Sequence, residues 1–280
     1  MKHQSISLLG RRSSNEDEID IVFNYENEMK YVNEMNYFAV YDGHGGNSMS
    51  KYIKDRLSRY FVDSRVTKVT SKSKTYNKYI MKVYNCMQEK VSQLTLTSKF
   101  CGSTALVVMQ YKKLNVFSQL KIINLGDCRA VLCNEDNIAI PLTKDHKPMS
   151  WDENKRIIAL DGNITIDKGD DPRINGLSVS RAFGDVEAQP HVTHIPDIYD
   201  YELNVSQGMI CDKFIILGCD GIWDVLSNQD AVDFVLYRLN ELRNIENTDK
   251  SNKKNIANLL GKYAISEGSG DNISVVILFL

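Results

Sequence analysis

Single carboxylates stand at the ends of predicted β-strands along this chain. Asp42 and Asp220 each directly follow an apolar segment and precede a glycine, while Asp127 and Asp271 stand beside two further segments of this kind. A buried carboxylate is costly unless it is paired or bound to a cation. Oxygen-only ligand sets suit Mg²⁺ or Mn²⁺ rather than Zn²⁺. The pattern favours a site for hard divalent cations, and a plain Asp-Gly turn is the alternative at any one position.

The composition is that of a globular protein. The chain has 280 residues, of which 42% are hydrophobic and 25% charged, with a formal net charge of −2. These values exclude general disorder and give no reason to expect a nucleic-acid or membrane-surface binder. The longest apolar run, at residues 275–280, is far shorter than a membrane span. The six cysteines include no CxxC pair, so we expect reduced thiols and a cytoplasmic or nuclear protein.

The hydrophobic spacing predicts helices and strands that are clustered rather than strictly alternating. Apolar residues recur at helical spacing in five segments, at about 49–61, 79–94, 150–161, 227–239 and 256–263. Short β-branched segments predict strands at 37–41, 104–109, 120–124, 129–133, 214–217 and 273–279. Capping boxes are expected at Ser150 with Glu153 and at Ser227 with Asp230. This arrangement indicates an α+β fold with a largely antiparallel sheet.

Eight short motifs, in this order along the chain, resemble those of the metal-dependent protein phosphatase 2C family. They are residues 12–17 (RSSNED), 41–46 (YDGHGG), 101–105 (CGSTA), 124–130 (NLGDCRA), 142–148 (LTKDHKP), 179–185 (VSRAFGD), 219–224 (CDGIWD) and 270–272 (GDN). Each string alone is weak evidence, but together and in order they are specific. The resemblance implies a sandwich of two mostly antiparallel β-sheets flanked by helices on both outer faces.

The resemblance also implies how the chain is organised. Residues 1–280 would form a single catalytic domain, with the family's variable flap at about 162–185. The flap is acidic here because it carries Asp167, Asp170 and Asp171. A further motif residue, Arg181, has a role that the sequence leaves open.

Six residues match the family's metal site, which holds two Mg²⁺ or Mn²⁺ ions and a weaker third. By position, Asp42 would bridge the two ions. Asp220 and Asp271 would hold one of them, and Glu16 with the carbonyl of Gly43 would hold the other. The third ion would be bound by Asp127 together with Asp220.

Three more residues match positions with a role in the reaction. Arg12 corresponds to the arginine that grips the substrate phosphate, His44 to the proposed general acid, and Asp17 to a residue that orients metal-bound water. The implied reaction is hydrolysis of phosphoserine or phosphothreonine by direct attack of a metal-bridging water. An arginine suits bidentate binding of phosphate, and a histidine can protonate the departing alkoxide.

The resemblance leaves other functions to be weighed. A catalytically inactive member that acts as a binding or scaffold protein is one alternative, but the complete set of metal ligands and the presence of Arg12 and His44 favour the enzyme. A nuclease is another, and the acidic chain with no aromatic and basic track argues against it. We therefore expect phosphorylated proteins as partners, no nucleic acid or membrane, and a monomer.

Two cysteines stand beside predicted metal ligands. Cys128 follows Asp127, and Cys219 precedes Asp220. Cations and Arg129 would favour the oxidisable thiolate forms of both. The alternative is that they are inert, buried small residues.

Overall fold

Two five-stranded antiparallel sheets form the centre of the molecule. The computed structural model describes residues 2–23, 35–62, 74–94, 97–113, 116–246 and 255–280. In the first sheet the strand order is β1 (Lys2–Leu8), β17 (Ile273–Phe279), β16 (Phe214–Gly218), β8 (Arg129–Cys133) and β9 (Ala139–Pro141). In the second sheet it is β13 (Asp197–Glu202), β7 (Val116–Leu125), β6 (Ala105–Lys113), β3 (Met35–Tyr41) and β2 (Glu18–Phe23).

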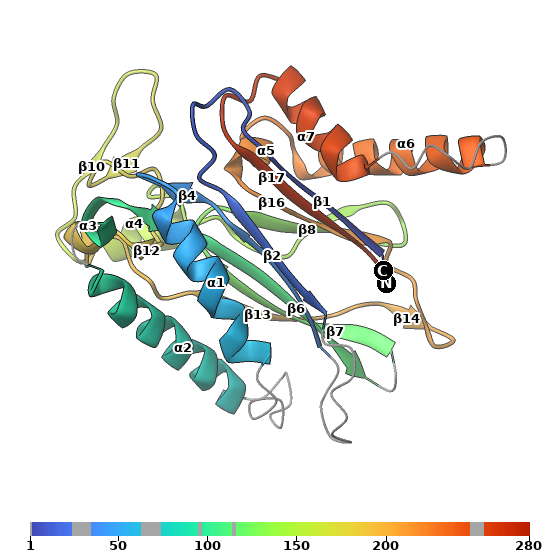
Figure 1. Ribbon diagram of the computed structural model, residues 1–280, viewed down its shortest axis with the longest axis horizontal. Helices are drawn as coiled ribbons and strands as arrows, with labels where there is room; N and C mark the ends of the chain where they lie inside the picture. The colour runs from blue at the N-terminus through green and yellow to red at the C-terminus, as the bar shows by residue number, and fades with distance from the viewer. Residues whose placement is uncertain (1, 24–34, 63–73, 95–96, 114–115, 247–254) are drawn as a thin grey trace.

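Helices cover both outer faces of this sandwich (Figure 1). Helices α1 (Ser48–Val62) and α2 (Lys74–Ser92) pack on the second sheet, and α6 (Asn228–Glu246) and α7 (Ile256–Ser266) pack on the first. The shorter helices are α3 (Thr97–Phe100), α4 (Trp151–Ile158), η1 (Val186–Ala188) and α5 (Asp220–Trp223). No helix within the described ranges is both long and apolar enough to cross a membrane.

The apolar side chains of the central strands explain the layered arrangement. In β17, Ile273, Val275 and Ile277 pack towards α6 and α7, whereas Val276 and Leu278 fill the space between the sheets. Because successive side chains of a strand point to opposite faces, a strand that is apolar at every position needs cover on both sides. The fully buried β3 and the buried residues 105–111 of β6 meet the same requirement.

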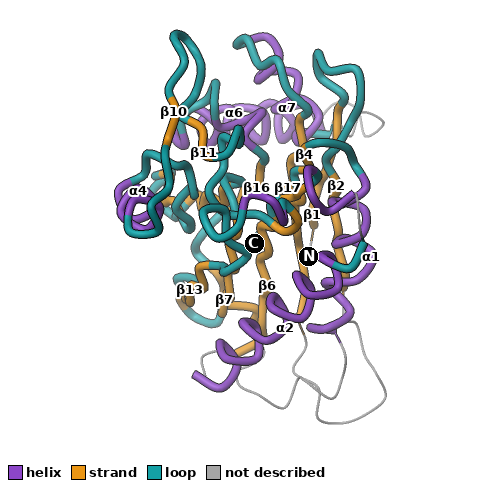
Figure 2. Tube along the Cα trace, turned by 90° about the vertical axis from the view of Figure 1, so that its left-hand side faces the viewer, coloured by secondary structure: helices purple, strands orange, loops and turns teal. Residues whose placement is uncertain are grey.

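Short strands gather at one end of the sandwich. A three-stranded sheet joins β12 (Phe183–Gly184), β5 (Gly102–Ser103) and β4 (Gly43–His44), and a hairpin joins β10 (Ile164–Thr165) to β11 (Arg173–Ile174). Figure 2 shows β10 and β11 at the same end of the molecule as β4, and Figure 1 agrees. A second small hairpin is formed by β14 (Val205–Ser206) and β15 (Met209–Ile210).

The predicted capping boxes have different outcomes. At the start of α6 the hydroxyl of Ser227 donates to Asp230 at 2.6 Å, and the Asp230 amide donates back to Ser227 at 3.1 Å, which confirms the box at Ser227. The box at Ser150 is wrong, because the Ser150 hydroxyl makes no capping bond and donates instead to the Lys147 carbonyl. Two arginines engage the carboxylate of Glu153, which therefore does not reach back to Ser150.

Candidate active site

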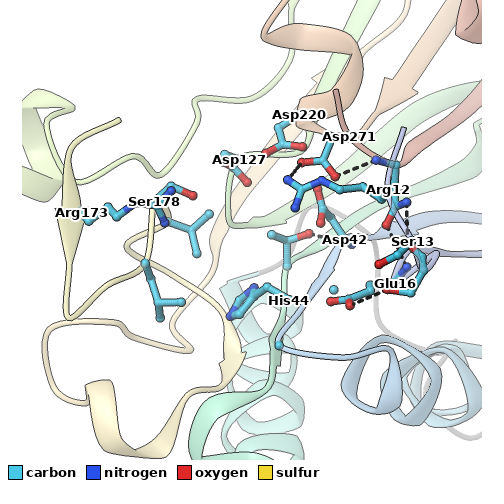
Figure 3. A pocket seen from close by; sticks show the side chains of 17 residues that line it. Arg12, Ser13, Glu16, Asp42, His44, Asp127, Arg173, Ser178, Asp220 and Asp271 are labelled. Carbon is cyan, nitrogen blue, oxygen red and sulfur yellow. Dashed lines mark hydrogen bonds and ion pairs between the residues drawn. The ribbon is translucent and has the colours of Figure 1, made fainter. Parts of the chain in front are cut away.

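One pocket of about 400 Å³ brings eight of the nine predicted site residues together (Figure 3). They are Arg12, Glu16, Asp42, Gly43, His44, Asp127, Asp220 and Asp271. We call this the acidic pocket. The ninth residue, Asp17, is buried against it, since ligand atoms of Asp17, Asp42 and Cys219 lie within 4.8 Å of one another.

Strand ends from both sheets position the carboxylates. Asp42 directly follows β3 of the second sheet, and Asp127 lies in the turn between β7 and β8. From the first sheet, Asp220 begins α5 just after β16, and Asp271 lies two residues before β17. Because the two sheets pack face to face, these strand ends meet at one end of the sandwich. Figure 3 shows the four side chains around a shared space.

This cluster has an excess of negative charge. Loss of hydration, and then repulsion from Asp220, raises the pKa of Asp42 well above its usual range. Loss of hydration and the charge of Asp127 do the same to the pKa of Asp220. Burial raises the pKa of Asp17 to about 6. Carboxylates that repel one another in this way are stabilised when cations enter between them.

The residues fit hard divalent cations. Five carboxylates line the acidic pocket and offer oxygen ligands to a cation. One buried oxygen of Asp17 makes no hydrogen bond within the part of the chain that the structure describes. The nearby sulfur of Cys219 is engaged by the backbone, since it accepts from the Ser274 amide at 3.1 Å and donates to the Asn272 carbonyl at 3.4 Å. An oxygen donor set of this kind suits Mg²⁺ or Mn²⁺.

Glu16 and Gly43 are held against each other. A Cβ atom at Gly43 would lie 2.4 Å from the Glu16 carbonyl oxygen, so only glycine fits there. The Gly46 amide donates to Glu16 Oε2 at 2.9 Å, and the Ser14 hydroxyl donates to Glu16 Oε1 at 3.1 Å. The carboxylate is therefore oriented before any cation binds.

Asn272 fixes the segment that carries Arg12 and Glu16. Its Oδ1 accepts from the Glu16 amide at 2.9 Å, and its Nδ2 donates to the carbonyls of Leu9 and Ser14 at 2.8 and 2.9 Å. The side chain thus ties the loop after β1 to the start of β17. Its position in the GDN motif was visible in the sequence, but this role was not predicted.

Arg12 lies at the mouth of the acidic pocket and pairs with one of its carboxylates. The Arg12 guanidinium donates to Asp271 Oδ2 at 2.6 Å, and this bond raises the pKa of Arg12. The Arg12 side chain remains 59% exposed. A guanidinium has five N–H donors, so donors remain for an anion that enters the pocket.

His44 is held by a carboxylate that we did not predict. Its Nε2 lies 2.7 Å from Asp185 Oδ2, and Asp185 is buried. Burial lowers the pKa of His44, but the hydrogen bond to Asp185 and nearby negative charges outweigh burial and raise it. A Cβ atom at Gly102 would lie 2.1 Å from Asp185 Oδ2 and 2.4 Å from His44 Nε2, so this contact requires glycine at 102. The pair supports the charged, proton-donating form of His44.

Comparison with known proteins identifies the family. A family profile described as protein phosphatase 2C matches residues 1–273. The chain belongs to the protein phosphatase 2C family. Among similar solved structures, a C. elegans sex determining protein is 25% identical, with a TM-score of 0.80 over 99% of this chain and 64% of that one. A serine-threonine phosphatase 2C from Toxoplasma gondii, 22% identical with a TM-score of 0.78, covers 99% and 94% and shares the fold. The predicted family and α+β sandwich are confirmed.

Curated relatives of the chain come from animals, plants and a virus. A PP2C-like domain-containing protein of Acanthamoeba polyphaga mimivirus is 44% identical over 57% of this chain and 93% of its own length. Bovine protein phosphatase 1L is 32% identical over 84% of this chain and 63% of its own length. The human integrin-linked kinase-associated serine/threonine phosphatase 2C is 32% identical over 88% and 63%. The chain thus spans 63% of the length of both animal relatives.

Lys147 pairs with a carboxylate of the acidic pocket, and this contact was not predicted. Its Nζ lies 2.9 Å from Asp127 Oδ2 and 3.5 Å from Asp224 Oδ1. Burial lowers the pKa of Lys147, but these two negative neighbours outweigh burial and raise it. Lys147 and Asp127 both lie in motifs quoted above, but the spacing between them in the sequence does not indicate that their side chains are in contact.

The structure answers the open question about Arg181. Its guanidinium donates to Glu153 Oε1 at 2.6 Å and to Asp197 Oδ1 at 2.8 Å. Arg156 donates to Glu153 Oε2 at 2.8 Å, and His146 Nε2 lies 3.2 Å from Asp197 Oδ2. We call these five residues the flap-base network, because they join α4 to the chain on either side of η1. Arg181 holds the structure together and does not line the acidic pocket.

The two cysteines beside predicted ligands are enclosed. Cys128 and Cys219 are both 0% exposed, and burial raises the pKa of both thiols well above the usual range. The sulfur of Cys128 lies 3.2 Å from the Thr104 hydroxyl. These surroundings favour the thiol over the thiolate and support the inert alternative.

Proposed function

We propose that this chain is a Mg²⁺- or Mn²⁺-dependent serine/threonine protein phosphatase. The observation that carries the proposal is the acidic pocket, in which a complete set of carboxylate ligands, an arginine and a paired histidine face one space. A member that serves only as a scaffold has no need for this set of charges. Two metal-site residues are also held in place by close packing, as the Gly43 contact with Glu16 shows.

Four carboxylates would hold two divalent cations. They are Glu16, Asp42, Asp220 and Asp271, and the Gly43 carbonyl would add a further oxygen, while Asp127 with Asp220 would bind a weaker third ion. When bound, the two ions would acidify water and offset the negative charge of the phosphoryl group. The four carboxylates and two divalent ions together carry no net charge, so a phosphate dianion is not repelled.

Arg12 and His44 would then act on the substrate directly. The Arg12 guanidinium would donate to phosphoryl oxygens in the ground state and in the transition state. Water oxygen forms the new bond to phosphorus and releases a proton to the solvent, while the bond from phosphorus to the serine or threonine oxygen breaks. The departing oxygen takes a proton from His44, which Asp185 orients through the 2.7 Å contact. No covalent bond between phosphorus and the chain is required.

The flap supplies the opposite wall of the acidic pocket. Arg173, Leu177, Ser178 and Val179 line it. Figure 3 shows Arg173 and Ser178 across from Arg12. The Arg173 guanidinium is held by Asp170 at 3.1 Å and by the Gly176 carbonyl at 3.0 Å. A pocket that opens between this wall and Arg12 suits a phosphorylated side chain on a protein surface, and we propose phosphoproteins as substrates.

Release of phosphate from a phosphoserine peptide tests the proposal. The metal-stripped chain should be inactive, and added Mn²⁺ or Mg²⁺ should restore turnover. Asp42→Asn should stay inactive with metal, whereas Asp136→Asn, which changes an exposed aspartate outside the pocket, should behave like the wild type. Tight Mn²⁺ binding without hydrolysis of any phosphopeptide would contradict the enzyme and favour the scaffold.

A further inference from the structure

Gln88 of α2 binds the backbone of Gly184, the residue before Asp185, through two hydrogen bonds. Its Nε2 donates to the Gly184 carbonyl at 2.9 Å, and its Oε1 accepts from the Gly184 amide at 3.0 Å. Gly184 ends β12, which lies at the edge of a three-stranded sheet, and Gln88 is only 5% exposed. A glutamine amide offers a donor and an acceptor, as a peptide group does. Gln88 therefore takes the place of a further strand beside β12 and supplies partners for buried backbone groups.

The packing of α2 on β12 fixes both partners of this contact. Tyr84 lies one turn before Gln88 on the same face of α2, and its ring centroid is 5.0 Å from that of Phe183. Both rings are fully buried. Gly184 has a φ of 86°, and a Cβ atom there would lie 2.2 Å from the Cys101 carbonyl oxygen, so only glycine fits. The two hydrogen bonds of Gln88 thus join a helix and a strand that are each held by close packing.

Asp185 has a backbone conformation that depends on its neighbours. Its φ of 45° and ψ of 43° lie in the left-handed region, which a residue other than glycine keeps only when its surroundings hold it there. The Asp185 amide donates to the Cys101 carbonyl at 3.4 Å, and Gln88 binds the carbonyl of the peptide group that joins Gly184 to Asp185. A shift of this peptide group would move the Asp185 carboxylate, which lies 2.7 Å from His44 Nε2.

We propose that Gln88 is a positioning residue for His44. It acts through Gly184 and Asp185 and lies outside the acidic pocket, so it touches neither the substrate nor a cation. The contacts lead from a helix on the outer face of the sandwich to the group that protonates the departing oxygen. This inference rests on the proposed function, because the role of Gln88 in turnover is limited to the step in which His44 donates its proton.

Gln88→Met tests the inference by kinetics, because methionine keeps the length of the side chain and removes both hydrogen bonds. The kcat for a phosphoserine peptide should fall by about 10- to 10²-fold, since a displacement of about 1 Å can cost this much. The KM for the peptide should change little, because Arg12 is untouched. Turnover of p-nitrophenyl phosphate should also change little, because its phenolate leaves without a proton. Gln93→Met removes an exposed glutamine just after α2 and should behave like the wild type.

A double variant shows whether Gln88 acts through His44. In the His44→Ala background, Gln88→Met should lower kcat on the peptide no further, because the group that it positions is already absent. An equal loss in both backgrounds would overturn the inference and leave Gln88 with a structural role alone. If Gln88→Met does not fold, Gln88→Leu replaces it, and an unchanged kcat in that variant overturns the inference equally.

Nuclear magnetic resonance of the metal-stripped chain gives a readout that needs no turnover. A carboxylate only accepts, so His44 Nε2 carries the proton of the bond to Asp185. This proton should give a slowly exchanging signal in the wild type and in Gln93→Met, and the signal should be lost to exchange with water in Gln88→Met. If the signal persists in Gln88→Met, the inference is wrong and the proposed function stands. If the signal is lost as expected but the wild type hydrolyses no phosphopeptide with Mn²⁺, the proposed function fails, while the positioning of His44 by Gln88 is supported.

Discussion

Two groups of buried carboxylates in this molecule have opposite electrostatic surroundings. Asp17, beside the acidic pocket, is 6% exposed, and burial raises its pKa to about 6. Glu153, in the flap-base network, is 2% exposed, yet hydrogen bonds from Arg181, Arg156 and Ser180 outweigh burial and lower its pKa to about 2. Similar burial therefore shifts the two pKa values in opposite directions, according to whether the chain itself supplies positive charge beside the carboxylate.

This difference distinguishes the flap-base network, which stabilises the fold, from the acidic pocket, which is the candidate metal site. The flap-base network contains its own cations, so its ion pairs are complete in the folded chain. The acidic pocket has fewer basic groups than carboxylates, and this imbalance is a cost in stability unless divalent cations are bound. An unbalanced cluster of this kind is typical of a site whose bound cations act on a substrate.

The largest expected effect comes from removing charge at the centre of the acidic pocket. Asp42→Asn should lose nearly all turnover, more than about 10³-fold, because one change would disable both cation positions. The fold should survive, since the substitution relieves repulsion. Steady-state turnover of a phosphoserine peptide with saturating Mn²⁺ checks this, and near-normal kcat in a folded variant would exclude the bridging role.

The next largest effect shows whether His44 donates a proton or supports the metal site. His44→Ala should lower kcat by about 10²-fold on phosphoserine peptides, whose alkoxide needs a proton to leave. It should matter much less for p-nitrophenyl phosphate, whose phenolate is already stable. The measurement is kcat for both substrates, and equal losses would show that His44 supports the metal site rather than donating a proton.

A change in the flap-base network should affect stability instead. Glu153→Gln should reduce the free energy of unfolding by about 3 kcal/mol, the value of a shift from 4.5 to about 2. Because the pKa of Glu153 is lower in the folded state, its contribution is present above about pH 4.5 and is lost as the pH falls towards 2. Urea unfolding across this pH window checks the prediction. The affinity for Mn²⁺ should not change in this variant. A loss of metal binding would contradict the claim that the flap-base network and the acidic pocket are independent.

The smallest expected effect concerns the enclosed thiols. The double variant Cys128→Ser, Cys219→Ser should lose activity to peroxide at the same rate as the wild type, because both sulfurs are 0% exposed. The readout is the inactivation rate at fixed peroxide concentration. Clear protection in the double variant would restore the redox role.

Much of the fold could be predicted from the sequence because its central strands are apolar on both faces. The predicted strands and all five predicted helices are confirmed, and β3, β8 and β16 show the signal most plainly. The strands β1, β2 and β13 were not predicted. They lie at sheet edges and mix polar with apolar residues, as in the sequence DIYDYE of β13, so their hydrophobic pattern is weak.

The site residues whose roles the family motifs imply could be predicted from the sequence. Arg12, His44 and the carboxylates of the pocket were named, and the structure brings them together. The contacts of Asp185 with His44 and of Lys147 with Asp127 could not be predicted, because they join segments that meet only after folding. The sequence separation of 141 residues between His44 and Asp185 shows why spacing holds no such signal.

Thermal unfolding of the metal-stripped chain tests most directly whether divalent cations stabilise the acidic pocket. Mn²⁺ at about 100 times its dissociation constant should raise Tm by about 5 °C, since binding to the folded state alone adds about 2.7 kcal/mol. Without metal, Asp42→Asn should unfold at a higher Tm than the wild type, and Mn²⁺ should change its Tm little. An identical Tm of the wild type with and without Mn²⁺ would contradict the account.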